Sequence, residues 1–403
     1  ITVGANDFVV LQETLSHVVD TSGYMSVDGH VHAGPSADNT ISIAERIATV
    51  AAEGLEVVVS ADHEVIVPWA SAVAEQGLSE WVATVVGQEV TAVSPEHTNM
   101  IGVPVWPEAV KGGPVAWYGL DLPSIFNAER ARGAQLVQLN HPRNGCNYMC
   151  LIRYNRLTGV PALTDPTVIG LPAGSALWTW DFDLFEFQNG NQDPFIDGAN
   201  PDATGTFEDW MSFLNLGHRI TVMANSDAHN YEIPGAPRNF FVCPTDNPAE
   251  FQESYLINAL AAGRVEASTG AFARVTVDGT AGMGDIITDR DGTVSVKVHI
   301  EAIPEIDVTR FKIFVNCRQV ASVNTTSPNG TVKYDGTVNV TVPTTKDAHL
   351  EVLGFGANYL PRGFPQFSPT RVPRFTTNAI YIDGNGSGTY TAPGTQSCTY
   401  TLP

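Results

Sequence analysis

The sequence predicts an α/β fold, a barrel or wound sheet of parallel strands, which is followed by a small antiparallel β-sandwich. Between Tyr24 and about Ala271, short apolar runs alternate with amphipathic stretches, as expected of successive βαβ units. After Ala271, shorter segments alternate apolar with polar residues and are separated by turn pairs. The 403 residues also exceed one ordinary core. We therefore expect an N-terminal extension at 1–23, a barrel domain at 24–271 and a β-sandwich domain at 272–403.

The elements of each domain follow from these patterns. The strand candidates of the first domain are the apolar runs at 24–32, 55–61, 82–90, 98–103, 135–140, 181–187 and 220–226. The helix candidates are the amphipathic stretches at 40–53, 67–77, 121–132, 205–217 and 250–263. In the second domain, strands are expected at 273–277, 293–301, 309–315, 331–342, 349–355 and 379–382.

Composition and charge restrict the classes of partner. The chain carries 21 basic and 43 acidic residues, a formal charge of −22, and this repels a phosphate backbone at long range. No apolar run is long enough for a membrane span. We therefore expect neither a nucleic acid nor a membrane as a partner. A small anionic substrate stays possible, because bound cations reverse the local potential.

The five cysteines contain no CxxC pair, which argues against a zinc ribbon or a thioredoxin-like site. Cys146 and Cys150 either form a short disulfide, as in an exported protein, or remain two free thiols. The low lysine count and acidic balance favour a periplasmic or extracellular location, and a cytoplasmic one stays open. The oligomeric state is not predicted.

The first motif with chemical meaning is Asp28-Gly29-His30-Val31-His32. Residues i and i+2 of a strand point the same way, so His30 and His32 can bind one cation together. Asp38 follows at the start of a helix candidate, from where its carboxylate can reach the same place. Each signal alone is better explained by chance or by a helix N-terminal charge.

Further histidines and acids follow the next strands. The second strand ends in Asp62-His63, for which we expect His63 to bind a cation and Asp62 to orient the ligands. Glu89 ends the third strand, at the rim where the sites of parallel barrels are built. His97, His141, Asp227 and His229 take comparable positions at later strand ends.

These signals become informative together. Six of the ten histidines fall at or beside strand ends of one domain. Buried imidazoles and carboxylates are costly unless they are paired or metal-bound. The sequence therefore predicts that they meet around shared cations. The other four histidines are interpreted as structural or surface residues, namely His17, His218, His299 and His349.

The ordered set HxH, SxD, DH, GxE, H, HP and SDxH resembles the PHP (polymerase and histidinol phosphatase) superfamily of metallohydrolases. Its details look most like the carbaryl-hydrolase branch, in the segments 35–38, 96–102, 182–190, 263–270 and 377–383. The resemblance spans roughly 24–390. It implies a distorted (βα)7 barrel, two or three divalent ions, and hydrolysis of phosphate or related esters. The ligands that it implies are His30, His32, Asp38, His63, Glu89, His97, His141, Asp227 and His229, with Glu89 bridging two ions.

Such a ligand set suits Zn, Mn or Fe, among which the sequence does not choose. Our hypothesis is that a hydroxide bridging two ions attacks the ester. Arg143 and Arg238 are candidates for neutralising a substrate oxyanion, and pairing of each with a surface acid is an equal alternative. The long insertion at 144–172 is expected to shape the substrate pocket.

Three functions stay open at this point. The leading hypothesis is a phosphoesterase that acts on small organic phosphate esters. A carboxyl-ester or carbamate hydrolase with the same cluster is the second. The third is a non-catalytic metal- or ligand-binding module, against which the full ligand set counts. A serine hydrolase is discarded, because the chain has no GxSxG motif.

Overall fold

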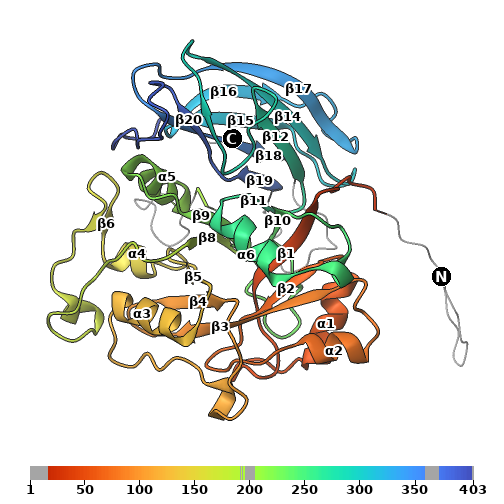
Figure 1. The fold of residues 1–403 in the computed structure, drawn as a ribbon, viewed down its shortest axis with the longest axis vertical. Coiled ribbons are helices and arrows are strands. Elements are labelled where there is room, and N and C mark those ends of the chain that lie inside the picture. The colour runs from red at the N-terminus through yellow and green to blue at the C-terminus, as the bar shows by residue number, and fades with distance from the viewer. Residues whose placement is uncertain (1–16, 191, 193, 196–204, 359–371, 402–403) are drawn as a thin grey trace, which may run out of the picture.

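The computed structural model describes residues 17–190, 192, 194–195, 205–358 and 372–401 (Figure 1). In Figure 1 the strands that follow residue 271 lie at the top, and α1 to α4 lie below them with the strands of a curled sheet. Of the N-terminal extension predicted at 1–23, residues 1–16 lie outside the described part of the chain.

The seven strands predicted for the first domain each correspond to an observed strand, and two more strands follow them. Their bounds are β1 (Tyr24–Val31), β2 (Val57–Ser60), β3 (Ala83–Thr91), β4 (His97–Ile101), β5 (Leu136–Leu139), β8 (Leu184–Asn189), β9 (Thr221–Asn225), β10 (Arg238–Val242) and β11 (Val265–Ser268). In the sheet they take the order β11-β10-β1-β2-β3-β4-β5-β8-β9.

The strand directions are mixed, whereas the alternation of strands and helices predicted parallel pairing. β1, β2 and β3 are parallel, as are β5, β8 and β9, but β4 is antiparallel to both β3 and β5. The reason is the short link of residues 92–96 between β3 and β4, because a parallel crossover needs a dozen or more residues. β4 therefore begins where β3 ends, with His97 opposite Thr91.

The sheet curls until the segment after its last strand, β9, meets the end of β1. The segment that follows β9 returns to the end of β1, where the Asp227 N–H donates to the His30 carbonyl (2.9 Å) and the His32 N–H donates to the Ala228 carbonyl (3.2 Å). The result is a curled half-barrel with few helices, and the (βα)7 count of the distorted barrel that the resemblance implies stays a prediction.

Helices cover this sheet and fix the loops at its edge. They are α1 (Ile43–Ala52), α2 (Ala70–Glu75), α3 (Leu122–Arg132), α4 (Tyr148–Leu151), α5 (Thr206–Leu216) and α6 (Glu253–Ala261). α1 starts at a capping box in which Ser42 and Glu45 bond each other's backbone N–H groups. This helix buries Ile47, Val50 and the whole side chain of Arg46.

The strands of the C-terminal half form two layers around one apolar core. They are β12 (Phe272–Val277), β13 (Ile286–Thr288), β14 (Thr293–Glu301), β15 (Arg310–Val315), β16 (Arg318–Asn324), β17 (Val332–Thr341), β18 (Ala348–Phe355), β19 (Arg374–Thr377) and β20 (Ile380–Asp383). β12, β14 and β17 make one sheet. Their inward residues, such as Val296, pack with residues of the other layer, such as Phe311 and Leu350.

The second layer is continuous with the sheet of the first half. β19 pairs with β11, so the hydrogen-bonded ladder passes from one half to the other, with Glu266 opposite Thr377. The pairs of this layer are antiparallel except for β13 with β20. The predicted boundary near 271 falls between β11 and β12, at a point where the two halves share a sheet.

The insertion at 144–172 holds short elements, namely α4, β6 (Tyr154–Asn155), β7 (Val160–Pro161) and the 3-10 turn η2 (Pro166–Ile169). Cys146 and Cys150 form a disulfide, and a second one joins Cys317 to Cys398. Cys243 is a buried free thiol. None of the described helices combines the length and apolarity that crossing a lipid bilayer requires.

Candidate metal centre

The nine predicted ligands meet at one edge of the curled sheet. His30 lies in β1 and His32 directly after it, and His63, His141 and the pair Asp227/His229 follow β2, β5 and β9. Parallel strands end at the same edge, so these side chains arrive together. The hairpin between β3 and β4 brings Glu89 and His97 to the same edge, because β4 starts beside the end of β3.

Glu89 is at the middle of the cluster. Its side chain is 1% exposed and faces five imidazoles. The distances from its oxygens to the ring nitrogens are 2.9 Å for His63 Nδ1, 3.1 Å for His97 Nδ1, 3.3 Å for His30 Nε2, 3.3 Å for His141 Nε2 and 3.6 Å for His32 Nε2. One carboxylate thus faces five imidazoles from four different segments.

Asp227 makes the second set of contacts. Its Oδ1 lies 3.0 Å from His32 Nε2 and 3.3 Å from His30 Nε2. His30, His32, Glu89 and Asp227 therefore form a group whose ligand atoms all lie within 4.8 Å of one another.

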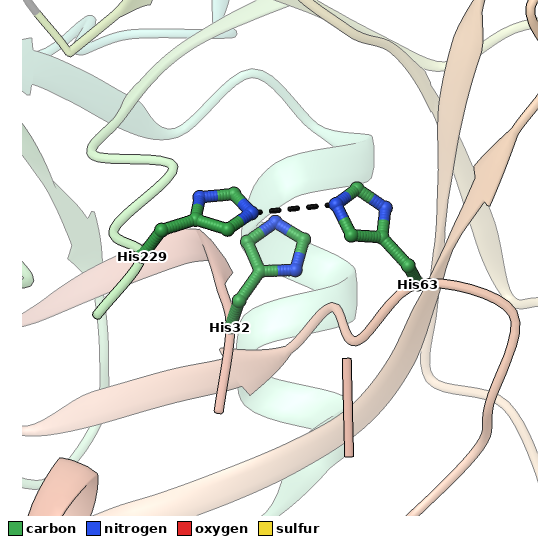
Figure 2. A group of neighbouring side chains, drawn as sticks. All are labelled: His32, His63 and His229. Carbon is green, nitrogen blue, oxygen red and sulfur yellow. Dashed lines mark hydrogen bonds between the residues drawn. The ribbon is translucent and has the colours of Figure 1, made fainter. Parts of the chain in front are cut away.

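A third set stands nearer the solvent and is made by His32, His63 and His229, whose rings face a common space (Figure 2). His63 Nε2 and His229 Nε2 are 3.3 Å apart. Asp38 Oδ2 lies 3.2 Å from each of these two nitrogens, and the Asp38 side chain is 54% exposed. Asp38 thus covers the mouth of the cluster.

Hydrogen bonds to Nδ1 leave Nε2 of three histidines as the ligand atom. His30 Nδ1 donates to Glu186 Oε1 (2.9 Å), and His229 Nδ1 donates to the Asp227 carbonyl (2.8 Å). His32 Nδ1 contacts Ser36 Oγ (3.2 Å), which in turn donates to Asp62 Oδ1 (3.1 Å). Such outer hydrogen bonds fix the tautomer and ring orientation of metal-ligating histidines. Asp62 is thus connected to His32 through Ser36, and the orienting role expected of it stays a prediction.

The donor set fits divalent cations. His30 Nε2 is buried and has no hydrogen-bond partner among the described residues, although Glu89 and Asp227 oxygens each lie 3.3 Å away. A buried nitrogen is costly to leave in this state unless a cation takes its lone pair. The three groups that could hold an ion are His32/His63/His229, His30/His32/Glu89/Asp227 and Glu89/His97/His141. Mixed imidazole and carboxylate ligands suit Zn, Mn or Fe.

The charges in the cluster favour the binding of cations. Burial alone would lower the pKa of His30, but the carboxylates of Asp227, Glu89 and Glu186 raise it well above its usual value. Burial would also lower the pKa of His141, but the hydrogen bond to Glu89 and the nearby carboxylates raise it to about 9. Burial lowers the pKa of His32 to about 3. In the absence of ions, protons on imidazoles thus balance the carboxylates, and cations would replace those protons.

The backbone at two ligands is held in an uncommon conformation. His141 has φ +23° and Asp227 has φ +52°, both in the left-handed region that side chains other than glycine rarely adopt. Hydrogen bonds hold both residues there, from the His141 N–H to Glu186 Oε2 (2.7 Å) and from the Asp227 N–H to the His30 carbonyl. Such strain, kept by surrounding contacts, is common at functional sites.

Three buried residues around the cluster were not singled out in the sequence. Glu186 in β8 is fully buried and accepts hydrogen bonds from His30, His141 and Asn225. Its signal was a carboxylate inside the apolar run 181–187. Ser36 and Arg46 were the others, and the Arg46 guanidinium donates to the carbonyls of the two ligand loops at His32, Ala228, Asn230 and Glu232.

The two predicted arginines have structural partners. Arg143 is 5% exposed and makes a two-pronged ion pair with the buried carboxylate of Asp209. Arg238 donates to the carbonyls of Gly235 (2.7 Å) and Glu53 (3.2 Å), at the end of α1. These contacts give no support to a role at a substrate oxyanion, which stays a prediction for both.

The other four histidines lie outside the three groups, as their interpretation requires. His17 is exposed, His218 stacks on Trp180 at 3.6 Å, and His299 contacts Glu301 (2.8 Å). His349 is fully buried beside Glu351.

A pocket of about 430 Å³ opens beside the cluster. Its lining residues are Asp38, Asn189, Gly190, Ser226, Asp227, His229, Asn230, Glu232, Ile233 and Ala236. No described residue of the insertion 144–172 lines it, so the expected part of this insertion in shaping a substrate pocket stays a prediction. The insertion acts instead on the ligands, through Asn147 Nδ2, which lies 3.2 Å from His141 Nδ1, and through the Tyr148 N–H, which donates to Glu96.

Comparison with known proteins adds little to this geometry. No protein-family model matches the chain, and no curated protein matches it. One similar solved structure is a two-domain protein from Bacteroides vulgatus, described as containing a predicted PHP-like metal-dependent phosphoesterase. It is 13% identical, has a TM-score of 0.44, and the match covers 91% of this chain and 98% of that one. The carbaryl-hydrolase-like details stay a prediction, and function rests on the site itself.

Proposed function

We propose that the protein is a metal-dependent hydrolase of small organic esters. The observation that carries this proposal is the convergence, in one pocketed cluster, of six histidines with Asp38, Glu89 and Asp227. The unpartnered Nε2 of His30 in the middle of this cluster is its clearest sign. Such a set exceeds what one tetrahedral site uses, so two or three ions fit better than one.

The residues divide naturally among adjoining positions. One position would be held by His32, His63 and His229 with Asp38 over it, one by His30 with Asp227, and one by His97 with His141. His32 belongs to two of the groups, and Glu89 belongs to two as well. We propose that Glu89 bridges two ions, because a carboxylate has an oxygen for each.

Divalent ions held there would supply a water acidic enough to attack at neutral pH and would polarise the ester oxygen. The chain's own part is to prepare this arrangement. Glu186, the Asp227 carbonyl and the Ser36–Asp62 pair keep protons on Nδ1 of their histidines, so that Nε2 stays free to bind. Asp38 is exposed at the mouth and is the carboxylate best placed to meet an incoming ester.

We propose organic phosphate esters as the first substrate class, with carboxyl esters or carbamates as the alternative, since the same cluster can activate water against either. Zn, Mn and Fe are the proposed ions. The two disulfides support a periplasmic or extracellular location, because structural disulfides persist in oxidising compartments.

The test combines metal analysis with a rate panel. We expect the purified protein to hold two or three Zn, Mn or Fe ions per chain, and to hydrolyse at least one of aryl phosphate mono-, di- and triesters, aryl acetate and aryl carbamate. The panel is run with each metal in turn, and His30→Ala is the blank. Fewer than one ion per chain, or equal rates in the blank, would contradict the proposal and favour a non-catalytic binding module.

A further inference from the structure

The pocket beside the cluster has a wall that no ligand residue occupies. Glu232, Ile233 and Ala236 build this wall, and Asn189 and Ser226 border it. Its volume of about 430 Å³ is in the range of small-molecule sites. A substrate with its ester at the cluster would place its remaining part against these residues.

This wall offers hydrogen-bond acceptors. Both hydrogens of the Asn189 amide have partners, in Glu186 Oε2 (3.0 Å) and Asp227 Oδ2 (3.1 Å), which leaves Asn189 Oδ1 as an acceptor. Ser226 is 9% exposed, but its Oγ is buried close to the Asp28 carboxylate and is not open to the pocket. The amide of Asn230, by contrast, is engaged on both atoms by Thr40 and Asp38.

Glu232 adds a negative charge that belongs to none of the three candidate ion-binding groups. Asp38 and Asp227 also line the pocket, but both face ligand imidazoles and would be balanced by bound cations. Glu232 accepts a hydrogen bond from the backbone N–H of His229 (2.8 Å), and its carboxylate is exposed and forms no ion pair with an imidazole of the described residues.

Positive side chains are missing from this pocket among the residues that the structure describes. Arg46 is fully buried behind the wall and directs its donors to four carbonyl oxygens, including that of Glu232. Arg143 is paired with Asp209. Among the described lining residues, an anionic group would therefore meet the Glu232 carboxylate and no cationic side chain, whereas an ammonium group would find an opposite charge and an acceptor.

We propose that the substrate is a small ester that carries an ammonium group away from its scissile bond, and that Glu232 selects this group. The primary ammonium donates to Glu232 and Asn189 Oδ1, while its carbon chain packs on Ile233 and Ala236. This inference rests on the proposed hydrolase function and deepens it, since it names the charge that the substrate carries. It applies to a phosphate ester and to a carboxyl ester alike.

The test uses three esters with the same reacting group and chain length, ending in an ammonium, a methyl or a carboxylate. We expect kcat/KM to be roughly twofold to fivefold higher for the ammonium ester than for the methyl ester, as for one exposed ion pair. The carboxylate ester should be the slowest. The difference should lie mainly in KM, and it should shrink as ionic strength rises.

Glu232→Gln should bring the ammonium-to-methyl ratio close to one, whereas Glu80→Gln, an exposed glutamate elsewhere, should keep the wild-type ratio. Calorimetry gives a readout without turnover, in which binding of n-butylammonium is measured and compared with binding of butyrate. The salt series on the wild-type protein decides the question if Glu232→Gln does not fold.

Equal or reversed ratios in the wild type, or an unchanged ratio in Glu232→Gln, would overturn the charge selection. Failure of the proposed function looks different. In that case the methyl ester is not hydrolysed at all, or it is hydrolysed equally by His30→Ala.

Discussion

Two buried histidine–glutamate pairs occur in this molecule, and only one of them belongs to the candidate metal centre. His30 pairs with Glu186 at 2.9 Å in the first half, and His349 pairs with Glu351 at 2.6 Å in the second. All four side chains are 0% exposed. Burial and pairing are therefore the same, and the second nitrogen of each ring makes the difference.

The second nitrogen of His349 has a hydrogen-bond partner, because His349 Nε2 lies 3.0 Å from Asn215 Oδ1 in α5. The backbone N–H of His349 also donates to Asn316 Oδ1 (2.9 Å). This pair thus joins the C-terminal strands to a helix of the first half. His30 Nε2 has no hydrogen-bond partner and shares its space with ligand atoms of three other residues.

The comparison teaches that a buried histidine is not by itself a sign of a metal. Glu351 even has an unpartnered oxygen of its own, Oε2, but none of the three candidate groups includes it. What distinguishes the centre is that ligand atoms of several residues lie within 4.8 Å of one another, and that one of them, His30 Nε2, has no hydrogen-bond partner among the described residues. Each prediction below changes this convergence, or the contacts behind it.

The largest effect is expected from the same substitution made in both halves. Glu89→Gln removes the charge that faces five imidazoles and should lower hydrolysis by about a thousandfold or more, in the range known for losing a key catalytic group. It should also reduce the number of bound ions, measured by elemental analysis. Glu351→Gln should keep the ion count and lose only about 1–3 kcal/mol of unfolding free energy, measured in urea.

If Glu351→Gln also lost ions, the two clusters would not be functionally distinct. If Glu89→Gln kept both ions and rate, the central role of Glu89 would be wrong.

The next effect concerns the residue behind the ligand. Glu186→Gln keeps the shape but weakens the acceptor of the His30 Nδ1 proton, and should lower metal affinity by roughly 10–100-fold. Titration with Co²⁺, followed by its visible absorption, measures this affinity. Glu266→Gln is the matched control, since Glu266 is equally buried but accepts from the Ala273 N–H. An affinity equal to that of the control would deny Glu186 an orienting role.

The third effect depends on pH. The pKa of His141 is raised to about 9, mainly by its hydrogen bond to Glu89 working against burial, so below this pH metal uptake must displace a proton. Metal affinity should fall by about tenfold for each pH unit below 9 for each proton displaced. Calorimetry in two buffers of different ionisation enthalpy counts the released protons.

The stability of the metal-free protein should fall as pH rises, whereas metal affinity should increase. A histidine whose folded pKa is raised stabilises the fold fully below its unfolded pKa of 6.5, and this contribution is lost as pH rises to about 9. The His141 contribution amounts to about 3 kcal/mol between these limits. In His141→Ala this part of the pH dependence should be absent, and an unchanged profile would contradict the assignment.

Strand positions and ligand types could be predicted from the sequence because they depend on local order. Alternation along β1 places His30 and His32 on one side, and an apolar run before each ligand marks where a strand ends. The antiparallel course of β4 could not be read from its own residues, since it depends on the short link before it. The hairpin nevertheless brought His97 to the predicted edge.

The errors and omissions concern partners that are distant in sequence. Arg143 follows the proposed ligand His141 by two residues, but it forms an ion pair with Asp209, which lies 66 residues away in the chain. In the sequence, Glu186 is one more residue of a predicted strand. Its role becomes visible only through its contact with His30, which lies 156 residues away in the chain. β11 and β19 join the two halves in one sheet, and no local pattern announces such a pairing. Periodicity indicates which way a side chain points, and only the folded chain shows what it meets.

The smallest effect should come from Ser36, which never touches the proposed ions but connects three parts of the centre. Its Oγ lies 3.2 Å from His32 Nδ1, donates to Asp62 (3.1 Å) and accepts from the His63 N–H (2.9 Å). Ser36→Ala would leave the Asp62 carboxylate with its other donors, Ala33 and Trp69, but would free the His32 ring.

Loss of one such hydrogen bond costs about 1 kcal/mol, so metal affinity at the position held by His32, His63 and His229 should fall by about fivefold. Co²⁺ titration resolves this as one weakened site among otherwise unchanged ones. Ser212→Ala, which removes a serine bonded to the Arg156 carbonyl away from the cluster, should leave every site unchanged. Equal weakening of all sites by Ser36→Ala would mean that Ser36 supports the fold of the edge as a whole, and that the orientation of His32 is set by its metal contacts alone.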